Sequence, residues 1–436
     1  MKEKDRNSLI TWIENLNIFP MRFDGRDFYK RIAYESISVW ERLEAGDVVQ
    51  EIRQLLPDSM NAAEAAKWVR EEIKSNPQFR CQKTGIKNKE EVITLQGRLN
   101  LKTLELNAVE DDENIYRFAN FHYLPQATWQ EAPYFTDYVR TSLGIDLLNS
   151  NDSAQGKKQL LLQILVYMCT ELWGAKKAVV LLGPASSGKT VLLDLLRAVI
   201  GEKRYTALSL ADLSDRFRGA LIDTACIIIN DEIGASIKNL DYVKKVISGE
   251  PVVVERKNGT PYTCQPNIKV CVAANALPLV LERDGEGAFS KRLQILQFLH
   301  AIPAEQWVLD LSEKIIAERD VIMSCAIRES ADFIAKPIFT DDEDGAKLLE
   351  MYQRENDSVK AFLYDSEVCK LGADEICLAE DFRSAYYAYC EAEGLPPIKK
   401  GLNLWLQQYG IRQERTRGDK YRNPRSHYRG VSLVRL

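Results

Sequence analysis

One stretch of eight residues has the spacing of a phosphate-binding loop. Residues 183–190 read Gly-Pro-Ala-Ser-Ser-Gly-Lys-Thr and fit the pattern G-x-x-x-x-G-K-[ST]. In such a loop, backbone N–H groups and a helix N-terminus surround phosphate oxygens, the lysine reaches the terminal phosphates and the hydroxyl holds Mg²⁺. The pattern predicts a site for ATP and Mg²⁺ formed by Gly183, Ser186, Ser187, Gly188, Lys189 and Thr190.

Two adjacent carboxylates follow the loop, at the end of the next long apolar run. Asp231 and Glu232 come directly after the apolar run 226–229 and Asn230. At the end of a strand, such acids face the ligand crevice of an α/β sheet. We expect Asp231 to hold Mg²⁺ through water, and Glu232 to orient and deprotonate the attacking water. An acidic pair at a solvated strand end is the alternative.

Three further polar residues could complete such a site. Asn275 ends the apolar run 268–274, so its amide would reach the same sheet edge and contact the γ-phosphate or the water. Arg292 follows later, before another apolar stretch. Asn258-Gly259 is a hairpin-turn signal, which places Lys257 near an exposed tip. Read alone, Asn275 could be a turn residue and Arg292 a surface arginine.

The elements that must position these residues form an α/β domain over residues 126–335. The apolar run 178–182 predicts a buried parallel strand before the loop, and a helix should extend from the loop to Ile200. Residues 134–173 have helical periodicity. Ahead of this domain, residues 1–125 form a small domain with a helix at 62–76 and strands within 92–106.

The C-terminal region, residues 345–436, has a different character. An acidic stretch at 340–345 predicts a linker before it. Helices near Asp357, Phe382 and Gly401, then strands at 411–415 and 428–434, predict a winged helix. Residues 391–436 hold ten Lys and Arg against four acids, which favours duplex DNA as a partner over a merely solvated basic face. The expected contacts are Arg415, Arg417, Lys420, Arg422 and Arg425.

Composition excludes several other classes of protein. With 436 residues, 45% hydrophobic and 28% charged, the chain is an ordinary folded protein. The longest apolar run, 160–174, is too short and too polar to cross a bilayer, and the mixed charges of residues 1–6 exclude a secretory signal. Nine scattered cysteines and three histidines offer no zinc ligand set and predict free thiols. We expect a cytoplasmic protein.

Together these motifs resemble the superfamily-3 helicases of the AAA+ ATPases, specifically the phage and plasmid primase-helicase family related to the poxvirus primase-helicase. The resemblance is strongest over residues 178–298. It implies that Asp231 and Glu232 are the Walker B acids and that Asn275 is the sensor residue. It further implies that the hairpin with Lys257 and Asn258 grips single-stranded DNA in a central channel, and that Arg292 is an arginine finger acting on a neighbour's nucleotide.

The resemblance implies an ATP-dependent replicative DNA helicase of a phage, plasmid or genomic island. It would be a hexameric ring that moves 3′ to 5′ on DNA and works alongside other replication proteins. Residues 99–106 resemble the small domain before the family's ATPase, and no primase domain is expected in the residues ahead of it. One alternative is a nucleotide-switched origin-binding initiator or helicase loader, which strand displacement would distinguish. Another is a small-molecule kinase, whose ATPase would not respond to DNA.

Overall fold

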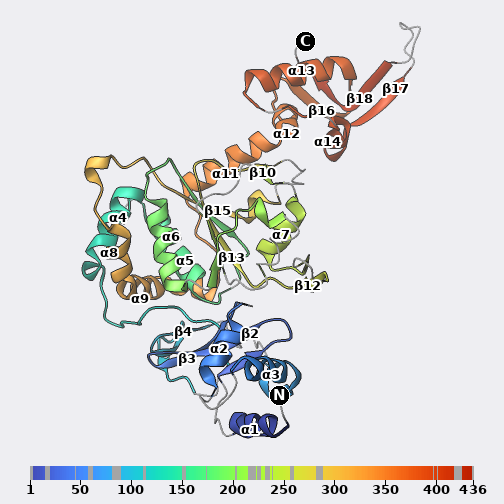
Figure 1. The fold of residues 1–436 in the computed structure, drawn as a ribbon. Helices are drawn as coiled ribbons and strands as arrows, with labels where there is room; N and C mark the ends of the chain where they lie inside the picture. Colours follow the sequence, from blue (N-terminus) through green and yellow to red (C-terminus); the bar gives the residue numbers. More distant parts are fainter. Residues whose placement is uncertain are drawn as a thin grey trace.

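The computed structural model arranges the chain as three parts that follow one another in space as they do in the sequence (Figure 1). The N-terminal part lies at one end, a central sheet with its helices in the middle, and the C-terminal part at the other end. The structure describes residues 3–14, 20–44, 46–56, 62–80, 90–110, 114–149, 154–172, 174–201, 204–214, 222, 227–230, 236–237, 239–255, 260–280, 288–395, 397–399, 401–416 and 425–434.

Two small antiparallel sheets build the N-terminal part, in the orders β1-β2-β3 and β4-β5-β6. The predicted helix at 62–76 and the strands within 92–106 are present. The elements are α1 (Glu3–Glu14), β1 (Met21–Phe23), β2 (Phe28–Tyr34), β3 (Ile37–Arg42), α2 (Val48–Leu55), α3 (Ala62–Ser75), β4 (Glu91–Thr94), β5 (Gly97–Asn100) and β6 (Leu106–Asn107).

The central part contains a five-stranded parallel sheet in the order β15-β7-β13-β9-β8, which agrees with the α/β class expected from the sequence. Its helices include α4 (Pro133–Leu143), α5 (Gln155–Cys169), α6 (Lys189–Ile200), α7 (Leu240–Ser248), α8 (Leu311–Ala317), α9 (Arg319–Glu329) and α10 (Ala331–Ala335). Its strands are β7 (Ala178–Leu182), β8 (Tyr205–Thr206), β9 (Ile227–Asn230), β13 (Lys269–Ala274) and β15 (Leu293–Gln297). Shorter strands are β10 (Ser236–Ile237), β11 (Val252–Val254), β12 (Tyr262–Cys264) and β14 (Leu279–Val280).

Both faces of this sheet are covered, because successive residues of a strand point to opposite sides. Val179 and Leu181 of β7 join a core with α4, α5, α6, α8 and α9. Ala178 and Val180 join a second core with α7. All residues of β7 and β13 are buried, which explains why their sequences are continuously apolar apart from Lys269. The Lys269 ammonium donates to the Tyr167 and Thr170 carbonyls at the C-terminal end of α5.

Two expectations from the sequence are wrong in detail. The helical stretch at 134–173 is two helices, because α4 ends at Gly144 in a left-handed conformation with φ +70°. The expected linker at 340–345 is packed structure, since α11 (Glu343–Asn356) begins inside it. Thr340 and Gln163 exchange two hydrogen bonds of 2.7 Å, and a Cβ on Gly345 would lie 2.8 Å from the Ile295 carbonyl oxygen. Helix α11 therefore lies directly on β15.

The C-terminal part has the three helices and two strands predicted, plus a strand that the sequence did not reveal. The elements are α12 (Ser358–Leu363), β16 (Cys369–Leu378), α13 (Ala379–Ala392), α14 (Leu402–Gln408), β17 (Arg412–Thr416) and β18 (Arg425–Leu433). The Asp357 side chain caps α12 by accepting from the Lys360 N–H at 2.9 Å. Strand β16 pairs with β18 at one edge of the sheet, with a register shift between Leu371 and Ile376.

Across the described residues, no helix combines the length and apolar character needed to cross a membrane. Seven of the nine cysteines lie in the described part of the chain, and all seven are free thiols. The remaining two, Cys81 and Cys226, lie outside it.

Candidate phosphate site and DNA-binding residues

The loop at 183–190 joins β7 to α6, as the sequence predicts, and rests on the ends of the neighbouring strands. The Gly183 N–H donates to the Ala274 carbonyl of β13 at 3.1 Å. On the other side, the Phe298 N–H donates to the Leu182 carbonyl at 2.7 Å, and the Ile302 N–H donates to the Ser186 carbonyl at 2.9 Å. These bonds fix the loop at the C-terminal edge of the sheet, where α/β proteins bind ligands.

Two glycines of the loop are required by close packing. Gly188 is the N-cap of α6 with φ +95°, and a Cβ there would lie 2.6 Å from Ser142 Oγ and 2.9 Å from Tyr138 Cε2. A Cβ on Gly183 would lie 2.7 Å from the Phe298 carbonyl oxygen. A side chain at either position would push the loop off its neighbours, and at Gly188 the backbone conformation also disfavours one.

Tyr138 of α4 supports the loop from behind. Its buried hydroxyl donates to the Gly188 carbonyl at 2.9 Å. Burial raises the pKa of Tyr138, so the hydroxyl remains a donor across the ordinary pH range. Tyr138 lies 50 residues before Gly188 and belongs to no motif, so sequence reasoning missed it, and nothing in a single sequence distinguishes it from an ordinary core tyrosine.

The Lys189 ammonium is buried at the base of the loop, with the residue 8% exposed. Its Nζ lies 2.8 Å from the Gly183 carbonyl oxygen, 2.5 Å from that of Pro184, 3.3 Å from Ser187 Oγ and 3.1 Å from Asn275 Oδ1. Burial lowers the pKa of Lys189. Among the described residues, these contacts are all neutral oxygens, so an anion in the loop would supply the charge that balances the ammonium.

Asn275 reaches Lys189 because of the strand order. Strand β13 lies between β7 and β9, and Asn275 directly follows β13 at the same edge as the loop. The Thr190 side chain is exposed on the first turn of α6, and Ser186 is exposed with φ +57°. The predicted acids Asp231 and Glu232 follow β9 immediately and lie outside the described residues.

Arg292 lies where the parallel strands begin, whereas the loop lies where they end. It ends a short 3-10 helix (Ser290–Arg292) and directly precedes β15, whose first residue, Leu293, pairs with Ala178 at the start of β7. The Arg292 Nε donates to Ser248 Oγ at 2.8 Å and its Nη1 to the Ala288 carbonyl at 2.7 Å. The structure therefore separates Arg292 from the Lys189 and Asn275 of its own chain.

The predicted DNA-binding residues are only partly described. Strands β11 and β12 form the predicted antiparallel hairpin, with Val252 opposite Cys264, but its tip with Lys257 and Asn258 lies outside the described residues. Arg417, Lys420 and Arg422 also lie outside them. Arg415 is exposed on β17 opposite Ser426 of β18.

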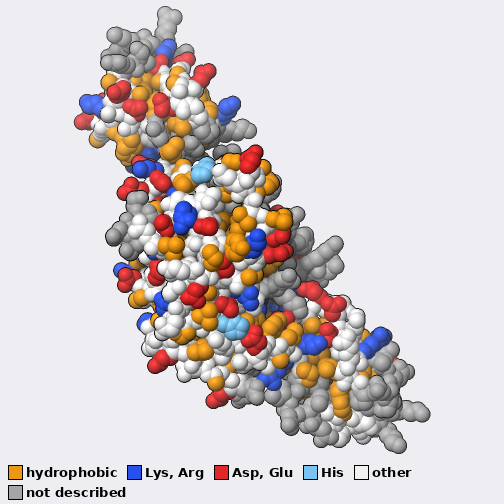
Figure 2. Space-filling view, turned by 90° about the vertical axis from the view of Figure 1, so that its left-hand side faces the viewer, with side chains coloured by type: hydrophobic (Ala, Val, Ile, Leu, Met, Phe, Trp, Pro, Cys, Tyr) orange, Lys and Arg blue, Asp and Glu red, His pale blue; other side chains and the backbone are white. Residues whose placement is uncertain are grey.

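Acidic and basic side chains lie close together in two places of the described part. Figure 2 shows the side of the central part that carries α4 and α8, and there acidic and basic side chains are interspersed. Arg412 and Arg429 are opposite each other on β17 and β18, and the Arg429 Nε lies 3.1 Å from Glu414 Oε2. That pairing reduces the basic character of this face of the sheet.

Comparison with known proteins gives a match to one family model and similarity to several solved structures. A model described as a family of unknown function (DUF5906) matches residues 181–292. This segment begins in β7 and ends at Arg292, so it contains the whole phosphate loop and Asn275.

Among the similar solved structures are three apo structures of the C-terminal region of NrS-1. The A form of that region is 11% identical to the chain, with 94% of this chain and 95% of that chain covered and a TM-score of 0.49. Another A form is 12% identical, covering 97% and 98%, with a TM-score of 0.48. A third apo structure is 12% identical, covering 98% and 100%, with a TM-score of 0.46.

Proposed function

We propose that the chain binds and hydrolyses ATP at the loop of residues 183–190. The observation that carries this proposal is the buried Lys189 ammonium, held among neutral oxygens 3.1 Å from Asn275 Oδ1 at the C-terminal edge of a parallel sheet. The loop leads directly into the N-terminus of α6, a 12-residue helix whose dipole favours anions. A triphosphate would replace the loop carbonyls as the partner of Lys189.

The side chains present fit Mg²⁺ as the accompanying ion. Thr190 exposes a hydroxyl on the first turn of α6, beside the position that the loop gives to phosphates, and Asp231 is the second proposed ligand. When bound, Mg²⁺ neutralises phosphate charge. Within this chain, Lys189 neutralises the terminal phosphates, Asn275 holds the attacking water, and Glu232 takes the proton from that water.

We further propose that hydrolysis drives a ring-forming DNA helicase, a superfamily-3 member of the AAA+ ATPases from a phage, plasmid or genomic island. The location of Arg292 is in keeping with a ring: Arg292 lies too far from the loop of its own chain to act there, so a nucleotide on which it acts belongs to a neighbouring subunit. The order of elements in the C-terminal part supports a winged helix that binds duplex DNA, and the β11–β12 hairpin supports a single-strand contact.

The direct test is ATP hydrolysis with and without DNA, followed by displacement of one strand from a forked duplex. A helicase hydrolyses ATP faster with DNA and displaces the strand, and Lys189→Ala does neither. The second candidate, a nucleotide-switched initiator or loader, is favoured by the basic residues of the C-terminal part and would bind DNA and ATP without displacing a strand. Absence of ATP binding by the purified chain would rule out both.

A further inference from the structure

Two neighbouring hollows line one side of α13 in the C-terminal part. The first has a volume of about 440 Å³, and the second about 550 Å³. Tyr387 lines both, so the hollows adjoin and form one groove, called here the α13 groove. The first hollow is lined by Leu378, Ala379, Glu380, Arg383, Ser384, Tyr387, Gln413, Arg425 and Ser426, and the second by Tyr387, Glu391, Leu395, Pro397 and Lys399.

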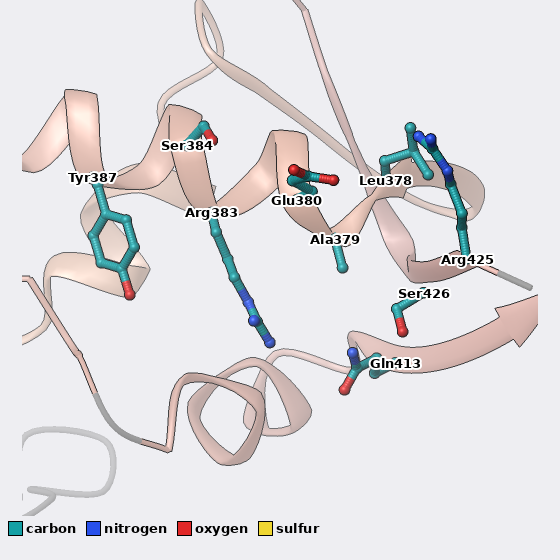
Figure 3. Close-up of a pocket in the computed structure, with 9 residues that line it drawn as sticks. All are labelled: Leu378, Ala379, Glu380, Arg383, Ser384, Tyr387, Gln413, Arg425 and Ser426. Carbon is teal, nitrogen blue, oxygen red and sulfur yellow. The ribbon is translucent and has the colours of Figure 1, made fainter.

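The groove follows a single stripe of α13. Glu380, Arg383, Ser384, Tyr387 and Glu391 recur at helical spacing, so they lie on one face of the helix. Figure 3 shows Arg383 and Tyr387 projecting from the same side of α13, with Gln413 of β17 and Ser426 of β18 beyond Arg383. The Tyr387 side chain remains 39% exposed, so one ring lies at the middle of the groove where a ligand can reach it.

Neutral side chains hold Arg383 in place. Its guanidinium lies 3.2 Å from Tyr428 Oη and 3.4 Å from Asn403 Oδ1, both neutral oxygens. These contacts fix the side chain between α14 and β18, and no ion pair forms between Arg383 and a carboxylate in the described part of the chain. A positioned guanidinium with neutral partners is suited to a phosphate.

Cations lie at both ends of the groove. Arg425 lines one end and Lys399 the other, while the carboxylates of Glu380 and Glu391 oppose them. Arg415 adds to the first end, because on β17 it is two residues from Gln413 and points to the same face, directly opposite Ser426. Three cations, Arg383, Arg425 and Lys399, therefore line the α13 groove with two carboxylates, and Arg415 lies beside its first end.

We propose that the α13 groove binds single-stranded DNA, with a base stacked on Tyr387 and the backbone phosphates near Arg383, Arg415 and Arg425. Proteins that bind single strands combine a positive groove with aromatic rings on which bases stack, and the groove has both. Gln413 and the two serines add hydrogen-bonding groups for base edges. This inference extends the proposed function: the single strand and the duplex share Arg415 and Arg425, so they bind the C-terminal part in turn, and Tyr387 and Arg383 distinguish the single strand.

The test measures binding of a fluorescent single-stranded oligothymidylate to the full chain without nucleotide, in a Lys257→Ala background that removes the hairpin lysine. Tyr387→Ala should weaken this binding roughly 5- to 150-fold, the range for one stacked base. Tyr387→Phe keeps the ring and should bind as the parent does. Tyr364→Ala is the matched control, because Tyr364 is an exposed tyrosine of the same part outside the groove.

A second measurement locates the strand directly. An oligonucleotide containing 5-iodouracil is irradiated with the chain, and the cross-linked peptide is identified by mass spectrometry. Cross-links at Tyr387 support the groove. Unchanged affinity in Tyr387→Ala, or cross-links confined to other parts of the chain, overturns it. These readouts need no ATP, so they separate a failure of the groove from a failure of the proposed ATPase.

Discussion

Replacement of Arg292 tests whether the site is completed by a second subunit. Gln297, the last residue of β15, is five residues after Arg292, so at about 3.3 Å per residue the two Cα atoms lie about 16 Å apart. Arg292 precedes the first residue of β15 and the loop lies beyond the last, whereas an extended arginine side chain reaches about 7 Å. Arg292 is thus too far away to touch the phosphates bound by its own chain.

Arg292→Ala should therefore stop hydrolysis through an effect on the neighbouring site. Arginine fingers contribute about 10³- to 10⁵-fold in rate, or about 4 to 7 kcal/mol of transition-state stabilisation. ATP affinity should change much less, because the nucleotide's own loop is intact. Lys291→Ala is the matched control, since Lys291 is an exposed cation one residue away.

The decisive assay mixes two inactive variants. Glu232→Gln subunits keep Arg292, and Arg292→Ala subunits keep Glu232, so a mixed ring contains junctions with both groups. We expect ATP hydrolysis to return on mixing. The reasoning is refuted if rings shown by mass measurement to be mixed stay inactive, or if Arg292→Ala alone hydrolyses ATP at the parent rate.

Three further predictions follow from particular contacts. Tyr138→Phe removes the hydrogen bond to Gly188, so ATP should bind more weakly and the thermal midpoint should fall by about 2 to 4 °C for about 1 kcal/mol, whereas Tyr134→Phe on the same helix changes neither. His122 lies 2.7 Å from Glu35 and 3.0 Å from Asp320, and the hydrogen bond to Glu35 is the main cause of its raised pKa. Protonated His122 therefore stabilises the fold fully below about pH 6.5, and this stabilisation is lost as the pH rises through the raised pKa. His122→Gln should abolish that decline in thermal unfolding scans, and a parallel pH profile in both proteins contradicts the assignment. Duplex binding should weaken with salt at a log-log slope of roughly −0.9 per phosphate, and Arg415→Gln with Arg425→Gln should reduce that slope by about 2; an unchanged slope would show that neither residue meets a phosphate.

Residues with strong local signals were predictable from the sequence. The strand at 178–182, the loop and helix α6 follow from an apolar run, two glycines and a lysine in fixed order. The meeting of Lys189 and Asn275 follows as well, because both come after parallel strands and such strands end at one edge of a sheet. The cap of α12 by Asp357 is a similar local effect.

Other features depend on contacts between distant segments and left no local pattern. Strand β16 carries a register shift and a largely exposed sequence, so it lacks the alternation that marks a strand. Strand β15 is an edge strand with glutamines at 294 and 297, which reads equally well as a loop. The α13 groove forms only when α13 packs against β16 and β18, so the residues of its first hollow are scattered from 378 to 426.

The central claim is that the Lys189 ammonium binds the phosphates of a nucleotide that the chain hydrolyses. The most direct measurement is the rate of phosphate release from ATP by the parent chain, by Lys189→Ala and by Lys176→Ala. Lys176 is an exposed lysine ahead of β7, at the end of the strand opposite the loop. We predict hydrolysis by the parent and by Lys176→Ala, and none by Lys189→Ala. Equal rates in the parent and Lys189→Ala, with folding confirmed by thermal scans, would contradict the account.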